Sequence, residues 1–213
     1  MNTDDLIKAL AADTATVERP VSQTMSLGIL TGVVLAAAVF CAMLNVRPDF
    51  LTAITHEPRF MFKFAFTMSL GLPALLLVWR LSRPDGEPGS LLWLLLLAPL
   101  LLAVALFLEM NAVPSEFWEV SAMGTMPGAC MKCIPILSLA PLAAALLALR
   151  QGATAYPVAA GAAAGLLSAA IGATLYASFC VDDSPMFLAI WYVAGVAIVV
   201  ALGALAGSRV LKW

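Results

Sequence analysis

Residues 91–110 read LLWLLLLAPLLLAVALFLEM, an apolar run whose only charged side chain, Glu109, stands next to its end. A helix needs roughly 20 mostly apolar residues to cross the hydrocarbon core of a bilayer. This run meets that length without a polar interruption. The stretch therefore decides the fold class, because it requires lipid as the solvent for at least one helix.

The composition of the whole chain extends this conclusion. Of its 213 residues, 62% are hydrophobic and 11% are charged, whereas a soluble domain has about 25% charged residues. We predict an all-α integral membrane protein, a bundle of six transmembrane helices separated by polar breaks rich in proline and glycine. The expected spans are residues 25–46, 60–80, 90–110, 131–149, 157–179 and 186–207.

The distribution of lysine and arginine predicts the orientation of the bundle. One face would hold Lys8, Arg19, Arg80, Arg83, Arg150, Arg209 and Lys212, and the other Arg47, Arg59, Lys63 and Lys132. Basic residues gather on the cytoplasmic side, so both termini are expected in the cytoplasm. Lys63, near the outer end of the second span, is expected to extend its ammonium group to the interface.

Several functional classes are disfavoured by what the chain contains. The formal net charge of -2 gives no indication of direct nucleic-acid binding. The spans hold almost no central charge, which argues against ion-coupled transport but leaves a carrier of a neutral solute open. A lone histidine, His56, rules out a His-rich metal centre, and no motif predicts a hydrolase or a cofactor.

Three of the four cysteines are predicted to lie at the outer membrane face. Cys130 and Cys133 open the fourth span and Cys180 closes the fifth. A short inner turn joins these two helices, so they are expected to be antiparallel neighbours whose outer ends meet. A disulfide needs Cα atoms within about 4.4–6.8 Å, which neighbouring helix ends can provide. Cys130 and Cys133 also lie at a helix N-terminus beside Lys132, and both features favour the thiolate form of these cysteines.

These cysteines allow three interpretations. They could form a structural disulfide or serve as small buried apolar residues. They could form a redox- or metal-responsive switch, with His56, Asp182 or Asp183 as further metal ligands. The pair Cys130 and Cys133 could also be the catalytic CxxC motif of a membrane thiol oxidase. Cys41, inside the first span, is expected to be a packed apolar residue.

The segment before the first span is acidic and amphipathic. Asp4 and Asp5 fall in the first turn of a predicted helix, where the helix dipole favours acids. One side of that helix is apolar at helical spacing and consists of Leu6, Ile7, Leu10 and Val17. A short isolated helix is marginal in water, so the segment either gains order in a partner's groove or is a disordered terminus.

Three motifs together resemble the NrsF family, the negative regulators of sigma F. The first is Thr3-Asp4-Asp5-Leu6-Ile7 with Arg19-Pro20 ahead of the first span. The second is Cys130-x-x-x-Ile134-x-x-x-Ser138-x-x-Pro141. The third is Cys180-x-Asp182-Asp183-x-Pro185-x-Phe187-x-x-Trp191-Tyr192. The resemblance covers essentially the whole chain.

This resemblance implies a multi-pass anti-sigma factor of the bacterial inner membrane, which is not an enzyme. Residues 1–24 would be a cytoplasmic tail that binds an extracytoplasmic-function sigma factor, and residues 25–213 a transmembrane sensor domain. Cys130 and Cys180 would be the pair that responds to metal or oxidative stress, with Cys133 as a competing thiol. The sequence does not indicate the oligomeric state, and the thiol oxidase and the solute carrier remain the alternatives.

Overall fold

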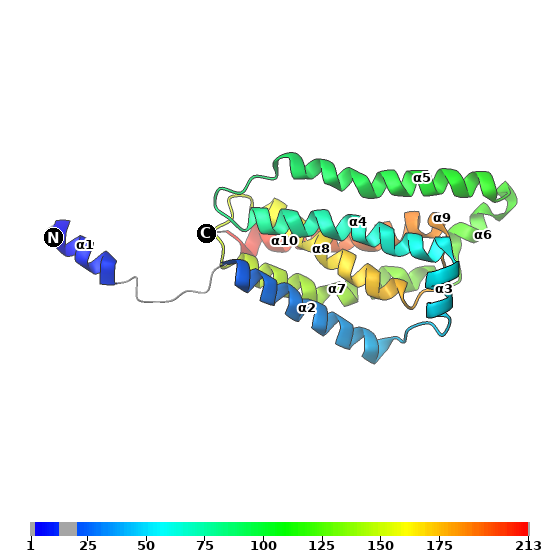
Figure 1. The fold of residues 1–213 in the computed structure, drawn as a ribbon, viewed down its shortest axis with the longest axis horizontal. Coiled ribbons are helices and arrows are strands. Elements are labelled where there is room, and N and C mark those ends of the chain that lie inside the picture. Colours follow the sequence, from blue (N-terminus) through cyan, green and yellow to red (C-terminus); the bar gives the residue numbers. More distant parts are fainter. Residues whose placement is uncertain (1–2, 13–20, 213) are drawn as a thin grey trace.

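The computed structural model describes residues 3–12 and 21–212, and every regular element within these ranges is helical (Figure 1). Six helical segments are long and apolar enough to span a membrane, which confirms the predicted fold class. They are Gln23–Met43, Pro58–Leu81, Gly89–Ala112, Pro127–Leu149, Pro157–Ala177 and Pro185–Val210. The first span begins and the last ends at the same end of the bundle (Figure 1).

Four spans are continuous α-helices: α2 (Val21–Met43), α4 (Pro58–Leu81), α7 (Pro127–Leu149) and α8 (Pro157–Ala177). The third span starts as a 3₁₀ helix, η2 (Gly89–Leu96), and continues as α5 (Leu97–Ala112). The sixth comprises α9 (Pro185–Phe187), a π-helical segment, η4 (Leu188–Tyr192), and α10 (Val193–Val210). The π-helical segment is a departure from regular helix that hydropathy does not predict.

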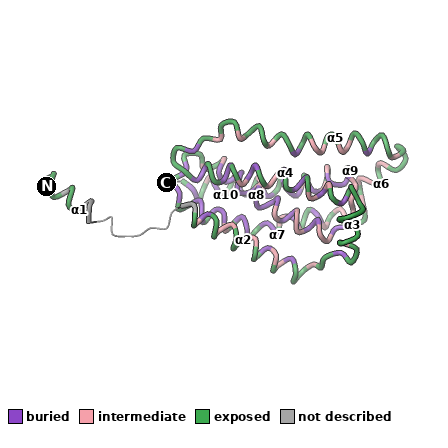
Figure 2. The backbone as a smooth tube through the Cα atoms, in the orientation of Figure 1, coloured by how far each residue is buried: buried purple, intermediate pink, exposed green. Residues whose placement is uncertain are grey.

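Helix α8 forms the centre of the bundle and α5 its periphery. Helix α8 packs against α4, α7 and α10, and it is largely purple in Figure 2, the colour of buried residues. Only 6% of the most apolar window of the third span is buried, against 61% for α8. The alanines and glycines of α8 allow this central position, because small side chains let neighbouring helices approach closely.

The closest helix contact joins α8 to α10 through two pairs of glycines. A Cβ atom at Gly161 would overlap the carbonyl oxygen of Gly203, and one at Gly165 would lie 2.7 Å from the carbonyl oxygen of Val199. The pairs are Gly161 with Gly165 and Gly203 with Gly207. Small residues at a spacing of four are typical of helices that approach closely in a membrane, so these glycines serve helix packing.

The longer connections lie at the end of the bundle away from the two termini (Figure 1) and are folded. We call this the outer end, after the orientation that the sequence predicts. Helix α3 (Phe50–His56) follows the first span, and η3 (Ser115–Phe117) and α6 (Trp118–Met123) lie between the third and fourth spans. Helix α6 packs against α9, and the indole of Trp191 donates a hydrogen bond to the carbonyl oxygen of Ala122 at 3.0 Å. The outer end of the bundle is thus a structured cap.

Candidate functional site

The structure brings Cys130 and Cys180 together at this outer end. Cys130 lies in the first turns of α7, because this helix begins at Pro127 rather than at residue 131. Cys180 follows α8 in the connection to the sixth span. Their side chains lie next to each other in one buried cluster, and the residues are 0% and 4% exposed. Both are free thiols, so the site is a reduced, buried cysteine pair.

The other two cysteines occupy different environments. Cys133 lies about one turn further along α7 and is partly exposed. Cys41 is exposed on α2, so the expectation that it packs inside the bundle is wrong. The neighbour of the Cys130 thiol is therefore Cys180, in the connection that follows α8, and not the second cysteine of its own CxxC motif.

Two buried tyrosines flank the cysteine pair. Tyr176 comes from the last turn of α8 and Tyr192 from η4, and their ring centroids are 5.8 Å apart. The hydroxyl of Tyr176 lies beside Cys130. The hydroxyl of Tyr192 lies beside Cys180 and makes no hydrogen bond of good geometry with the described residues. Tyr192 belongs to the π-helical segment η4, and π-helical turns, although rare, frequently lie at functional sites.

Asp183 joins two cations next to Cys180. Its Oδ1 atom lies 2.5 Å from Nζ of Lys63, and its Oδ2 atom lies 3.0 Å from Nη1 of Arg47. Lys63 also donates a hydrogen bond to the carbonyl oxygen of Cys180, at 2.9 Å. The side chain of Lys63 is 0% exposed, so the expectation that it extends to the interface is wrong. An ion pair and a hydrogen bond hold it inside the protein instead.

Arg47 ties the outer end of the first span to this cluster. Its guanidinium pairs with Asp49 at 2.6 Å and lies 4.9 Å from the ring centre of Phe60. Its backbone N–H donates a hydrogen bond to the carbonyl oxygen of Ser178 at 3.0 Å. The hydrogen bonds that Arg47 makes to Asp49 and Asp183 raise the pKa of Arg47. The hydrogen bond that Asp49 accepts from Arg47 lowers the pKa of Asp49. Arg47 is therefore a permanent cation at this position.

The neighbouring residues of the same connection bind further elements. Asp182 accepts hydrogen bonds from the backbone N–H of Thr125, at 3.0 Å, and from its hydroxyl, at 2.9 Å. The hydroxyl of Ser184 lies 3.4 Å from Glu109 on α5. Gly124 has a positive φ of 60°, and a Cβ atom there would lie 2.8 Å from Cγ of Asp182. Residues 180–184 thus contact α4, α5 and the segments that follow α2 and precede α7. We call residues 180–184 the sensor loop, after the role proposed for them below.

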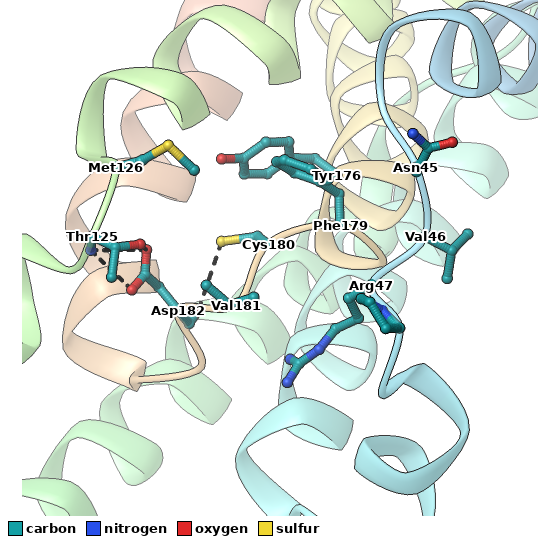
Figure 3. A pocket seen from close by; sticks show the side chains of 11 residues that line it. Asn45, Val46, Arg47, Thr125, Met126, Tyr176, Phe179, Cys180, Val181 and Asp182 are labelled. Atoms are coloured by element: carbon teal, nitrogen blue, oxygen red, sulfur yellow. Dashed lines mark hydrogen bonds between the residues drawn. The ribbon is translucent and has the colours of Figure 1, made fainter.

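A cavity of about 260 Å³ lies beside the sensor loop (Figure 3). Residues from three parts of the chain line it, including Arg47, Thr125, Met126, Tyr176, Cys180 and Asp182. Neither Cys130 nor Cys133 is among the lining residues. Cys180 is therefore the thiol of the pair that a small molecule in this cavity would contact.

The surroundings of Cys180 favour its ionised form. The hydrogen bond from the Cys130 thiol is the main cause, and the positive charge of Lys63 adds to it. Together they lower the pKa of Cys180 to about 6, although burial acts in the opposite direction. A thiolate is the nucleophilic and metal-binding form of cysteine, so Cys180 has the chemistry of a reactive thiol at neutral pH.

The residues considered as metal ligands do not converge in this structure. Within the described ranges, no group of three or more histidine, cysteine, aspartate or glutamate side chains is placed to hold a metal ion. Asp182 is engaged by Thr125, and Asp183 by Arg47 and Lys63. His56 lies away from Cys180, in a second cavity that it shares with Glu57, Arg59 and Asp183. A metal ion would therefore require these side chains to rearrange.

The predicted tail helix is present as α1 (Thr3–Ala12). Asp4 and Asp5 lie exposed in its first turn, and Ile7 is 58% exposed. The side chains of Leu6 and Leu10 lie outside what the structure describes, as do Val17 and Arg19 altogether. The exposed Ile7 leaves an apolar position of this helix available for contact.

The comparisons with known proteins agree on one family. Residues 10–213 match the family described as NrsF, negative regulator of sigma F. The chain is 35% identical to the "Probable anti-sigma-F factor NrsF" of Azospira oryzae and 37% identical to the "Anti-sigma-F factor NrsF" of Caulobacter vibrioides, with 100% of each chain covered. No solved structure matches this chain.

Proposed function

Because the chain belongs to the NrsF family of negative regulators of sigma F, we propose that it is an anti-sigma factor of the bacterial inner membrane. It holds a sigma factor of the extracytoplasmic-function type through its N-terminal tail, residues 1–24. It releases that sigma factor when Cys130 and Cys180 at the outer end of the bundle change state. The change is an oxidation, a reduction or the capture of a metal ion.

One observation carries this proposal furthest. The buried thiol pair and the attachment of the tail lie at opposite ends of the helical bundle. Helix α2 begins at one end, and the connection from α8 to α9, which contains Cys180, lies at the other (Figure 1). With both termini in the cytoplasm, the thiols face the exterior. The bundle then separates a chemical sensor from a protein-binding segment.

The tail supports partner binding by its shape and charge. Its exposed Asp4 and Asp5 would meet basic residues of the sigma factor, and its apolar side, including Ile7, would enter a groove. Val17 and Arg19 would extend this contact toward the membrane. A bound helix of this kind would cover a sigma surface that otherwise engages RNA polymerase.

The tail is tested by co-purifying a sigma factor with the solubilised full-length protein. We expect Ile7→Asp to reduce the recovered sigma factor at least tenfold, because a charge on the apolar side opposes burial in a groove. Lys8→Asp introduces the same charge at an exposed position about 100° around α1 from Ile7 and should leave recovery within twofold of wild type. Equal recovery with Ile7→Asp and wild type would remove the tail from the mechanism.

The supporting observations favour regulation over catalysis. The CxxC motif does not form the hydrogen-bonded pair that a thiol oxidase based on Cys130 and Cys133 would be expected to use, since Cys130 faces Cys180. The curated relatives are named as anti-sigma factors and not as enzymes.

A further inference from the structure

We propose that Cys180 is the attacking sulfur of the thiol pair, that Lys63 is its positioning residue, and that Cys130 is the resolving thiol. This inference deepens the proposed function and rests on it, since an order of reaction matters only if the pair is the sensor.

Access to the two sulfurs is unequal. Cys180 lines the cavity of about 260 Å³, with the apolar residues Val46, Met126 and Phe179 nearby (Figure 3). Cys130 is 0% exposed and does not line that cavity. A small neutral electrophile that enters the cavity therefore reaches Cys180 first, and Cys130 only after the chain moves.

Lys63 places a buried positive charge next to Cys180. Its ammonium group donates a hydrogen bond to the carbonyl oxygen of Cys180 at 2.9 Å and pairs with Asp183 at 2.5 Å. Burying an ammonium ion is costly even when it is paired, and an apolar side chain of similar size would often pack as well. The charge of Lys63 thus has a use beyond packing, which is to stabilise an anion at Cys180.

Tyr192 adds a donor on the other side of the sulfur. Its hydroxyl is fully buried beside Cys180 and lacks a hydrogen bond of good geometry among the described residues. A phenol in this position can donate to a thiolate. The charged and titratable groups around Cys180 are Lys63, Arg47, Cys130, Cys133, Tyr176, Tyr192, Asp182 and Asp183. Of the two cations, Arg47 is held by Asp49 and Asp183, and Lys63 is the one whose charge lowers the pKa of Cys180.

A hydroperoxide is the simplest electrophile for this arrangement. The thiolate of Cys180 attacks the terminal oxygen, the O–O bond breaks, and the departing alkoxide takes a proton from water. Cys180 is oxidised by two electrons to a sulfenic acid, and the hydroperoxide is reduced to an alcohol. Cys130 then attacks the sulfur of Cys180, the S–O bond breaks, and water leaves with the proton of the Cys130 thiol as the disulfide forms.

The order of reaction can be measured on reduced full-length protein in lipid nanodiscs. Iodoacetamide is added between pH 5 and 9, and mass spectrometry follows the alkylation of each cysteine. We expect Cys180 to react at least tenfold faster than Cys130, with a rate that rises with pH around a midpoint near 6, the pKa of Cys180. The rate rises because only the thiolate reacts.

The role of Lys63 is measured in the same assay. Lys63→Met should move the midpoint of Cys180 toward the ordinary thiol pKa of about 8.5 and slow its alkylation at pH 6.5 by about tenfold, since each pKa unit changes the thiolate fraction about tenfold. Lys63→Arg should restore most of the rate. Lys132→Met, which removes a lysine beside Cys133, is the matched control and should leave the Cys180 profile unchanged.

A second variant guards against misfolding. Lys63→Met combined with Asp183→Asn removes both members of this ion pair, so that Asp183 is not left buried with Arg47 as its one remaining cation, and should show the same shifted midpoint. Faster alkylation of Cys130 than of Cys180 would overturn the inference. So would an unchanged Cys180 profile in both Lys63→Met and the double variant Lys63→Met with Asp183→Asn. The assay contains no sigma factor, so it is independent of the proposed function, which instead fails if Cys180→Ser cells respond normally to stress.

Discussion

Asp183 is the residue on which the outer charge network depends. Its side chain is 14% exposed and contacts both Lys63 and Arg47, whereas the other partner of Arg47, Asp49, is 53% exposed. A buried charge that loses its partner keeps its desolvation cost without compensation. Lys63 has no second carboxylate among its described ion pairs, so the stability of the sensor loop should depend on Asp183 far more than on Asp49.

Substituting these two acids separately measures that difference. Asp183→Asn should lower the free energy of unfolding by about 3–5 kcal/mol, the usual cost of breaking a buried ion pair. Asp49→Asn, the matched control, removes an exposed carboxylate from the same arginine and should cost less than about 1 kcal/mol. Thermal unfolding in detergent gives both values, and equal losses would show that burial does not set the strength of this network.

Single residues also mark the limit of prediction from the sequence. The cysteines could be assigned to one membrane face because their positions at span ends follow from hydropathy. The burial of Lys63 could not be predicted, because it depends on the path of the sensor loop, which brings Asp183 and the carbonyl oxygen of Cys180 to it. The orientation of Tyr192 depends likewise on η4, a local change in helix register.

At the scale of elements, the bundle is organised around the contact of α8 with α10. Helix length and hydropathy suffice to predict all six spans, because the bilayer sets both requirements. The same reasoning misses α3 and α6, which are short helices whose stability comes from packing on the bundle rather than from their own sequences. It also places the start of the fourth span too late, since Pro127 begins that helix.

The glycines of this contact make the packing testable. Gly161→Ala should destabilise the protein by about 1–3 kcal/mol, the usual cost of overpacking, because its Cβ atom would overlap the carbonyl oxygen of Gly203. Gly128→Ala is the matched control, since a Cβ atom there meets nothing within 4 Å. Thermal unfolding compares the two, and an unaffected Gly161→Ala protein would mean that the helices are less closely packed than described.

At the scale of the whole molecule, the sensor loop and the tail are connected through the first span. Arg47 lies just beyond the outer end of α2 and contacts Asp183, while the inner end of α2 follows the tail. A change at Cys180 can therefore reach α2 through two neighbouring residues. Changing the ratio of two conformations from 1:99 to 99:1 takes about 5.5 kcal/mol of differential free energy. A full response of the bundle therefore requires that several contacts of the sensor loop are lost together.

The separation of the thiols from the tail depends on the orientation of the bundle in the membrane. Labelling with a membrane-impermeant maleimide measures that orientation. In a protein whose native cysteines are replaced by serine, Val181→Cys places a thiol at an exposed position of the sensor loop, and Lys8→Cys places one on the tail. In right-side-out membrane vesicles we expect Val181→Cys to be labelled at once and Lys8→Cys only after detergent is added. Immediate labelling of Lys8→Cys, with Val181→Cys protected until lysis, would contradict the account.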